Sequence, residues 1–230
     1  FVAAGLWGAS IGLVPAPRAG AADVNWVAEP ALGELSGLAA SGRVPDAFWA
    51  HNDSGHAAEL FLMGADGALR QRVVLPGIAA RDWEDLAAFE WRQQRWLAIA
   101  DTGDNFARRD ELAILLLPEP DAAVPPAPPR RIRLRFAEGP RDVEALAVDA
   151  AAGQILLLEK RRPPAGLYVL DLEGADQQLA RRIATLPERW PEAAAPVETI
   201  GDQRYRGAIS AMDLSADGRA LALLSATHWT

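Results

Sequence analysis

The chain has 230 residues, of which 50% are hydrophobic, and a formal net charge of -8. This length and apolar content favour one or two packed domains and exclude a disordered chain. The acidic balance argues against a nucleic-acid partner, because phosphate binding depends on clustered Lys and Arg side chains. The sequence has no cysteine, so the fold depends on its core without disulfide support.

The N-terminal residues 1–22 are interpreted as the remnant of a secretory signal peptide. An apolar run is followed by Pro17, Arg18 and a series of small residues, and cleavage after Ala21 or Ala22 would fit this pattern. The run is too short to cross a membrane comfortably, so we expect no transmembrane span in the mature chain. A buried N-terminal helix is the alternative. The sequence thus predicts a periplasmic or secreted protein whose folded domain covers residues 23–230.

The rest of the chain contains an internal repeat, which is the first pattern to seek in a sequence. Four segments share one frame, with an apolar residue at its common position; they are GELSGLAA with Leu38, RDWEDLAA with Leu86, RDVEALAV with Leu146 and GAISAMDL with Met212. These common positions are 48, 60 and 66 residues apart. Such periods are typical of propeller blades with loops of variable length.

Each repeat continues as a series of short apolar runs separated by turn residues, which favours antiparallel hairpins over helices. Second runs are expected at 47–55, 96–105, 154–162 and 220–228, third runs at 59–67, 112–121 and 166–174, and fourth runs at 68–77, 130–139 and 179–188. Four strands per repeat predict an all-β fold, a β-propeller of four-stranded antiparallel blades. About three and a half blades are present, with residues 24–30 as a candidate closing strand. An open β-sandwich is the alternative, but it does not explain the shared leading motif.

Two tripeptides, Asp53-Ser-Gly and Asp101-Thr-Gly, raise the question of an aspartic protease. Each Asp lies 15 residues after the common Leu of its own repeat, so the two are equivalent positions in adjacent blades. Adjacent blades do not build two lobes that face each other across a cleft. Ordinary turn chemistry, in which the carboxylate accepts backbone N–H bonds, is the better interpretation.

Propeller topology places the loop before each first strand and the loop after each second strand on one face, where the central channel opens. The candidate ligand-binding residues on that face are Asn52, Asp82, Asp104, Asn105, Asp142, Glu159, Lys160 and Arg161, and Asp53 lies among them. Converging carboxylate and amide oxygens are hard ligands that suit Ca²⁺ better than Zn²⁺. The alternative is structural: Arg81 with Asp82, and Arg141 with Asp142, would form ion pairs between blades.

At RDWEDLAAF, IADTGDN, RDVEALAVD and AISAMDLSADGRALALLS the chain resembles a group of secreted bacterial β-propellers. This group includes phytase-like esterases and gluconolactonase-like propellers. The resemblance implies Ca²⁺ at the channel mouth and hydrolysis of phosphate esters or lactones, with Glu84, Glu144 and Asp101 facing the metal. Asp53, the equivalent of Asp101, is the fourth metal candidate. The third repeat departs from the pattern, because Glu159-Lys160-Arg161 replaces the Asp-Ser/Thr-Gly tripeptide.

Two functions follow as expectations. In the first, the channel-mouth face binds a small molecule or an envelope component, and any Ca²⁺ is structural. In the second, the protein is a Ca²⁺-dependent hydrolase of phosphate esters, esters or lactones, with the metal activating water. The sequence supplies neither a nucleophile nor a complete ligand set, which favours the binding function.

Overall fold

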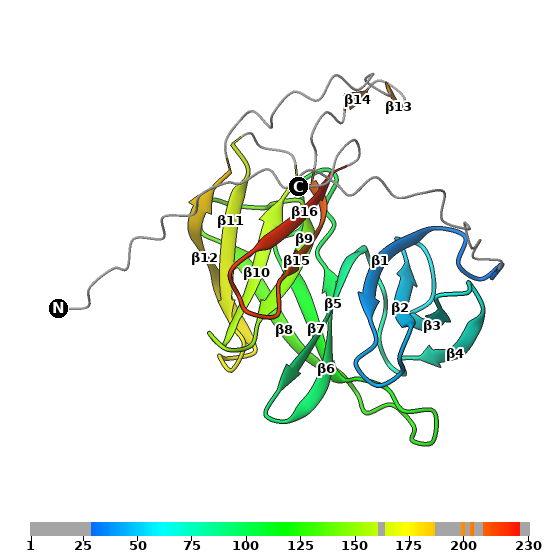
Figure 1. Ribbon diagram of the computed structural model, residues 1–230. Helices are drawn as coiled ribbons and strands as arrows, with labels where there is room; N and C mark the ends of the chain where they lie inside the picture. Colours follow the sequence, from blue (N-terminus) through cyan, green and yellow to red (C-terminus); the bar gives the residue numbers. More distant parts are fainter. Residues whose placement is uncertain (1–28, 161–163, 187–198, 201–202, 205–208, 226–230) are drawn as a thin grey trace, which may run out of the picture.

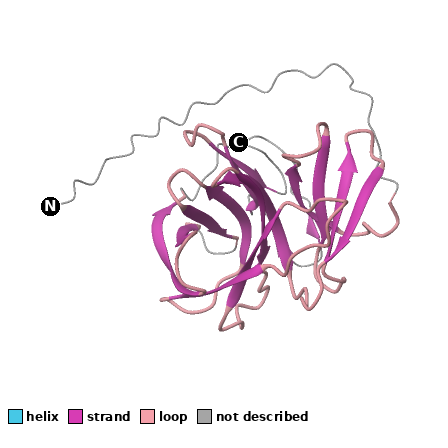
Figure 2. Cartoon of the chain, turned by 90° about the horizontal axis from the view of Figure 1, so that it is seen from below, coloured by secondary structure: helices cyan, strands magenta, loops and turns pink. Residues whose placement is uncertain are grey.

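The computed structural model describes residues 29–160, 164–186, 199–200, 203–204 and 209–225. Within these ranges every regular element is a β-strand (Figure 2), and no helix is available to span a membrane. The proposed signal peptide and most of the candidate closing strand at 24–30 lie outside the described residues.

Three sets of four consecutive antiparallel strands follow one another along the chain (Figure 1), as the repeat predicts. Blade 1 consists of β1 (Leu35–Ala40), β2 (Ala47–Asn52), β3 (Glu59–Gly64) and β4 (Leu69–Val74). Blade 2 consists of β5 (Trp83–Trp91), β6 (Gln94–Asp101), β7 (Leu112–Pro118) and β8 (Arg130–Phe136). Blade 3 consists of β9 (Val143–Asp149), β10 (Gln154–Glu159), β11 (Gly166–Asp171) and β12 (Gln177–Thr185).

A fourth unit begins with the antiparallel pair β15 (Ile209–Leu214) and β16 (Leu221–Ser225). It is preceded by the short pair β13 (Thr199–Ile200) and β14 (Gln203–Arg204). The first strands of the four units, β1, β5, β9 and β15, pack against one another: β5 contacts the other three and β9 contacts β15. This arrangement confirms the prediction of three blades and the first half of a fourth.

Blades 2 and 3 are also joined at their outer edges, which the repeat does not predict. Strands β8 and β12 pair in parallel from Arg133 with Gln177 to Phe136 with Ala180, so the two blades form one continuous eight-stranded sheet. Equivalent strands of two repeats run in the same direction, which is why this pairing is parallel. Arg130 supports the junction, because its Nε lies 2.8 Å from Asp176 Oδ1.

Most of the hydrophobic core consists of layers between successive blades. Trp49 and Trp83 are almost completely buried in the layer between blades 1 and 2. The layer between blades 2 and 3 contains Ile114, Ile132 and Tyr168, and a third layer packs blade 3 against Ile209 and other residues of the fourth unit. Burial of these apolar side chains is the main force that holds the blades together.

Each first strand carries a β-bulge at the same position of the repeat. The pairing register with the second strand shifts between Leu35 and Leu38 in β1, and between Trp83 and Leu86 in β5. It also shifts next to Val143 in β9 and next to Ile209 in β15. A bulge leaves an extra residue outside the regular alternation and turns its side chain in a new direction. The repeat thereby presents one extra side chain per blade at the same end of the four strands.

Candidate functional site

The four bulges meet around a cavity at the channel mouth. Ser36, Glu84, Glu144 and Ser210 are the bulge residues two positions before the common apolar residue, and all four line this cavity of about 280 Å³. The remaining lining residues are Leu35, Asp53, Asn105, Lys160, Ala211 and Leu224. Every blade that the structure describes therefore contributes to one mostly polar cavity.

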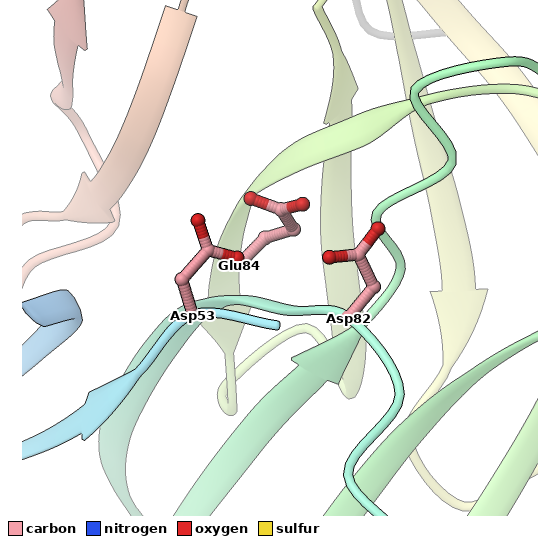
Figure 3. Close-up of side chains that lie close together, drawn as sticks. All are labelled: Asp53, Asp82 and Glu84. Carbon is pink, nitrogen blue, oxygen red and sulfur yellow. The ribbon is translucent and has the colours of Figure 1, made fainter. Parts of the chain in front are cut away.

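Carboxylates from three blades converge in and beside this cavity. Asp53 follows β2, Asp82 directly precedes β5, and Glu84 is the second residue of β5 (Figure 3). One carboxylate oxygen from each lies within 4.8 Å of the others. A second group contains Glu84 again, now with Asp142 and Glu144 from the beginning of β9, within the same limit. Glu84 belongs to both groups, so it lies between the two sets of charges.

The crowding of these carboxylates changes their protonation. Burial, followed by the charges of Glu144, Asp82 and Asp53, raises the pKa of Glu84 to about 10. Burial also raises the pKa of Glu144, and burial together with the charge of Asp53 raises the pKa of Asp82. Like charges in a site with little water favour the neutral form. The neutral form of Glu84 is therefore favoured at neutral pH, beside the carboxylate of Glu144.

Lys160 is the basic member of the cavity and the single lysine of the sequence. Its Nζ lies 2.5 Å from Glu144 Oε1, and its charge opposes the rise in the pKa of Glu144. This ammonium group compensates part of the negative charge of Glu144, whereas Asp53, Asp82 and Glu84 belong to blades 1 and 2.

We expect Glu84→Gln to stabilise the metal-free protein at pH 7 by about 1–3 kcal/mol. The pKa of Glu84 rises from 4.5 to about 10 on folding, so its stabilising contribution is complete below pH 4.5 and is lost as pH rises toward 10. Glutamine mimics the neutral form and removes this loss. Urea unfolding between pH 5 and 9 with a chelator measures the effect, and Glu90→Gln, an exposed position on the same strand, is the control. If the free energies of unfolding of wild type and Glu84→Gln change with pH in the same way, the prediction is contradicted.

Two residues predicted for this face lie in supporting positions instead. Asp101 forms a buried ion pair with Arg109, 2.9 Å from Oδ1 to Nη2, and it is in neither carboxylate group of the described residues. Asp104 accepts hydrogen bonds from the backbone N–H groups of Arg108 and Arg109, and its own N–H donates to Asp142 Oδ1 at 2.9 Å. These residues shape the loop after β6 and attach it to blade 3.

Asn52 and Glu159 are likewise used for structure. Asn52 accepts a bond from the N–H of Glu34 and donates one to the carbonyl of Ala31. Glu159 accepts a bond from the N–H of Gly166 and lies 3.2 Å from the guanidinium Nε of Arg141. Arg161, the remaining candidate, lies outside the described residues.

The two arginines of the structural alternative, Arg81 and Arg141, have different surroundings. Arg141 forms ion pairs with Glu159 and Glu138. Blades 2 and 3 are joined by other contacts: Thr102 Oγ1 donates to the carbonyl of Val143 at 2.7 Å, and ion pairs link Arg92 to Glu173 and Arg130 to Asp176. Arg81 is exposed, and no ion pair of this residue occurs within the described part of the chain.

Two important residues escaped the sequence analysis. Asp85 is buried, and its carboxylate accepts backbone N–H bonds from three strands. Burial raises its pKa to about 7 in spite of these bonds. Gly103 lies against the acidic groups, because a Cβ at this position would overlap the carboxylates of Glu84 and Asp82. The sequence contains a signal for Asp85: it is a charged residue at a repeat position where the other three repeats have the small residues Gly37, Ala145 and Ala211.

No protein-family model matches the chain, and no curated protein matches it either. Among solved structures, the β-propeller domain of Myceliophteria thermophila Cps50 (Swd1) is similar, with 10% identity, a TM-score of 0.44 and coverage of 85% of this chain and 50% of that one. Kuenenia stuttgartiensis hydrazine synthase has 12% identity and a TM-score of 0.46, with coverage of 84% and 57%. The Dos1 propeller has 10% identity and a TM-score of 0.41, with coverage of 82% and 42%.

The chain thus spans about half the length of these three structures. At such low identity a likeness concerns the fold and not the chemistry of a site. The assignment of the fold depends on the sheets themselves, which repeat the same strand order from β1 to β12 and begin it again at β15. The chain is therefore an all-β protein built from four-stranded propeller blades.

Proposed function

We propose that this protein is a binding propeller whose channel-mouth cavity holds a divalent cation, Ca²⁺ by its donor chemistry, together with a small polar ligand. The observation that carries the proposal is the convergence of five carboxylates from three blades, arranged as two groups that share Glu84. Asp53, Asp82, Asp142 and Glu144 are the other four.

The donor set suits a hard cation. Ca²⁺ binds six to eight oxygen ligands at about 2.4 Å, so two of its ligands lie at most about 4.8 Å apart. The carboxylate oxygens of each group satisfy this limit. The hydroxyls of Ser36 and Ser210 and the amide of Asn105 line the same cavity and supply neutral oxygens. A bound cation would also offset the repulsion that raises the pKa of Glu84.

The cavity leaves space for more than an ion. A volume of about 280 Å³ is close to the lower limit of small-molecule sites. Carboxylate, hydroxyl, amide and ammonium groups on its wall match a ligand that both donates and accepts hydrogen bonds. Leu35 and Leu224 add apolar contact at its edge. A small polyhydroxylated molecule or a polar portion of an envelope component has this chemistry.

Calorimetric titration of the full chain with Ca²⁺ tests the proposal. We expect saturable binding by the wild type, and binding at least about tenfold weaker in Glu84→Gln and in Glu144→Gln, because affinity depends on the number of charged ligands. Glu90→Gln removes the same charge from an exposed position of β5 and should bind as the wild type does. Absence of binding by the wild type, or equal loss in all three variants, would overturn the cation site.

Hydrolysis of a phosphate ester, an ester or a lactone is a second candidate. It is favoured by the contact of Lys160 Nζ with Glu144 Oε1, which places a cation for an ester oxygen beside a potential base. Assays with one substrate of each class, with Ca²⁺ and with a chelator, decide between the candidates. Turnover that requires Ca²⁺ and is lost in Glu144→Gln would support a hydrolase, and binding without turnover would leave the binding function.

A further inference from the structure

We infer that Asp85 is the positioning residue of the channel-mouth cavity: its buried carboxylate ties three first strands together and thereby fixes Glu84, Glu144 and Ser210 around the site. The effect of Asp85 on Ca²⁺ binding rests on the proposed function, whereas the bridge between the blades is given by hydrogen bonds. Asp85 lies in the bulge of β5, directly after Glu84.

The carboxylate of Asp85 connects three blades through backbone groups. Oδ1 accepts the N–H of Leu86 in its own strand at 2.9 Å. Oδ2 accepts the N–H of Leu146 in β9 at 2.8 Å and that of Met212 in β15 at 3.3 Å. One oxygen therefore carries both bonds to other blades. The side chain is 3% exposed, so water does not compete effectively for these bonds.

The three donors occupy one position of the repeat. Leu86, Leu146 and Met212 are the common apolar residues of their units, so their N–H groups converge as equivalent parts of blades 2, 3 and 4. At the position of Asp85 itself the other repeats have Gly37, Ala145 and Ala211. Gly37 is required by close packing, because a Cβ there would overlap the ring of His51. Among the four repeats, Asp85 is therefore the carboxylate at a position where the others have small residues.

The hydrogen bonds of Asp85 fix the positions of cavity-lining residues, because Leu146 and Met212, whose N–H groups it binds, are close in sequence to the lining. Glu144 and Ser210 each lie two residues before an N–H group that Asp85 holds, and Glu84 precedes Asp85 directly. The pairing between the first and second strands is interrupted at the bulges that carry these side chains, so regular strand hydrogen bonds do not hold them in place. Outer groups that orient metal ligands typically contribute 10–100-fold in affinity. Asp85 fulfils this role from beneath the site without belonging to either carboxylate group.

The test compares Asp85→Ala, Asp85→Asn and Ile132→Ala in the full chain. Alanine removes both bonds to other blades, whereas asparagine keeps one oxygen that can accept them. Ile132, fully buried in the outer strand β8, is a control that destabilises the core away from the bulges. Two quantities are measured for each folded variant: hydrogen exchange of the Leu146 and Met212 amides without metal, and Ca²⁺ affinity by calorimetry.

We expect Asp85→Ala to lose exchange protection at both amides and to bind Ca²⁺ about tenfold or more weakly, with substantial recovery in Asp85→Asn. Ile132→Ala should keep wild-type affinity. Unchanged protection at the two amides, or wild-type Ca²⁺ affinity in Asp85→Ala, would overturn the inference. A wild type that binds no Ca²⁺, while Asp85→Ala still loses protection at both amides, would remove the cation site and the role of Asp85 in it, but leave the bridge between blades.

Discussion

Replacement of Arg109 by Met is expected to lower the free energy of unfolding by about 3–5 kcal/mol, because it leaves a buried carboxylate without its partner. Arg109 and Asp101 have side chains that are 6% and 2% exposed, and their ion pair is 2.9 Å long. The guanidinium also donates to the carbonyls of Gly103 and Asp101. Methionine fills much of the space but satisfies none of these acceptors. Urea denaturation monitored by tryptophan fluorescence measures the change.

The double variant Arg109→Met with Asp101→Asn should recover part of this loss, since the uncompensated charge is then removed. Arg92→Met is the matched control, because Arg92 pairs with Glu173 at 2.8 Å on the surface, where both side chains are largely exposed. We expect this control to change stability by about 0.5 kcal/mol or less. Equal effects of Arg109→Met and Arg92→Met would show that the buried pair has no special importance.

Replacement of Gly103 by Ala is expected to weaken Ca²⁺ binding by at least about tenfold, equivalent to about 1.4 kcal/mol. A Cβ at this position would overlap Glu84 Oε1 and the carboxylate of Asp82, so both groups must move away from the loop after β6. These carboxylates belong to the same group as Asp53, and their mutual spacing would be lost. Calorimetry with Ca²⁺ at a temperature well below unfolding measures the effect.

Gly33→Ala is the control for the added methyl group, because a Cβ at Gly33 would meet open space. Its Ca²⁺ affinity should equal that of the wild type. If Gly103→Ala also binds Ca²⁺ normally, Glu84 and Asp82 are not the groups that hold the ion. This result would argue against the proposed cation site even if the wild type binds Ca²⁺ elsewhere.

The segment from Asp101 to Asp104, which contains the Asp-Thr-Gly tripeptide typical of aspartic proteases, has a structural role. Asp101 holds Arg109, Thr102 bonds to blade 3, Gly103 gives space to two carboxylates, and Asp104 organises the following turn. Asp53, the equivalent of Asp101 in blade 1, instead belongs to the carboxylate group with Asp82 and Glu84. Equivalent repeat positions therefore have different functions, because Arg109 in blade 2 provides a partner for its own Asp.

The sequence by itself determined the fold class and the three and a half blades present in this chain. Turn residues and short apolar runs recur in a fixed order, and each repeat must bury its faces against its neighbours, so local pattern and architecture agree. This reasoning identified all the strands from β1 to β12 together with β15 and β16. Glu84 and Glu144 were selected through the resemblance to secreted β-propellers, and they lie at the same distance before Leu86 and Leu146.

Only the tertiary structure decided which of the candidate residues meet and what each one does. The parallel pairing of β8 with β12 and the bridge made by Asp85 join residues from different blades. The ion pair of Asp101 with Arg109 joins the end of β6 to the loop that follows it. A repeat motif describes what each blade shares, whereas these contacts depend on the differences between blades. The distances between side chains on separate strands are set by bulges and packing, which a linear pattern does not contain.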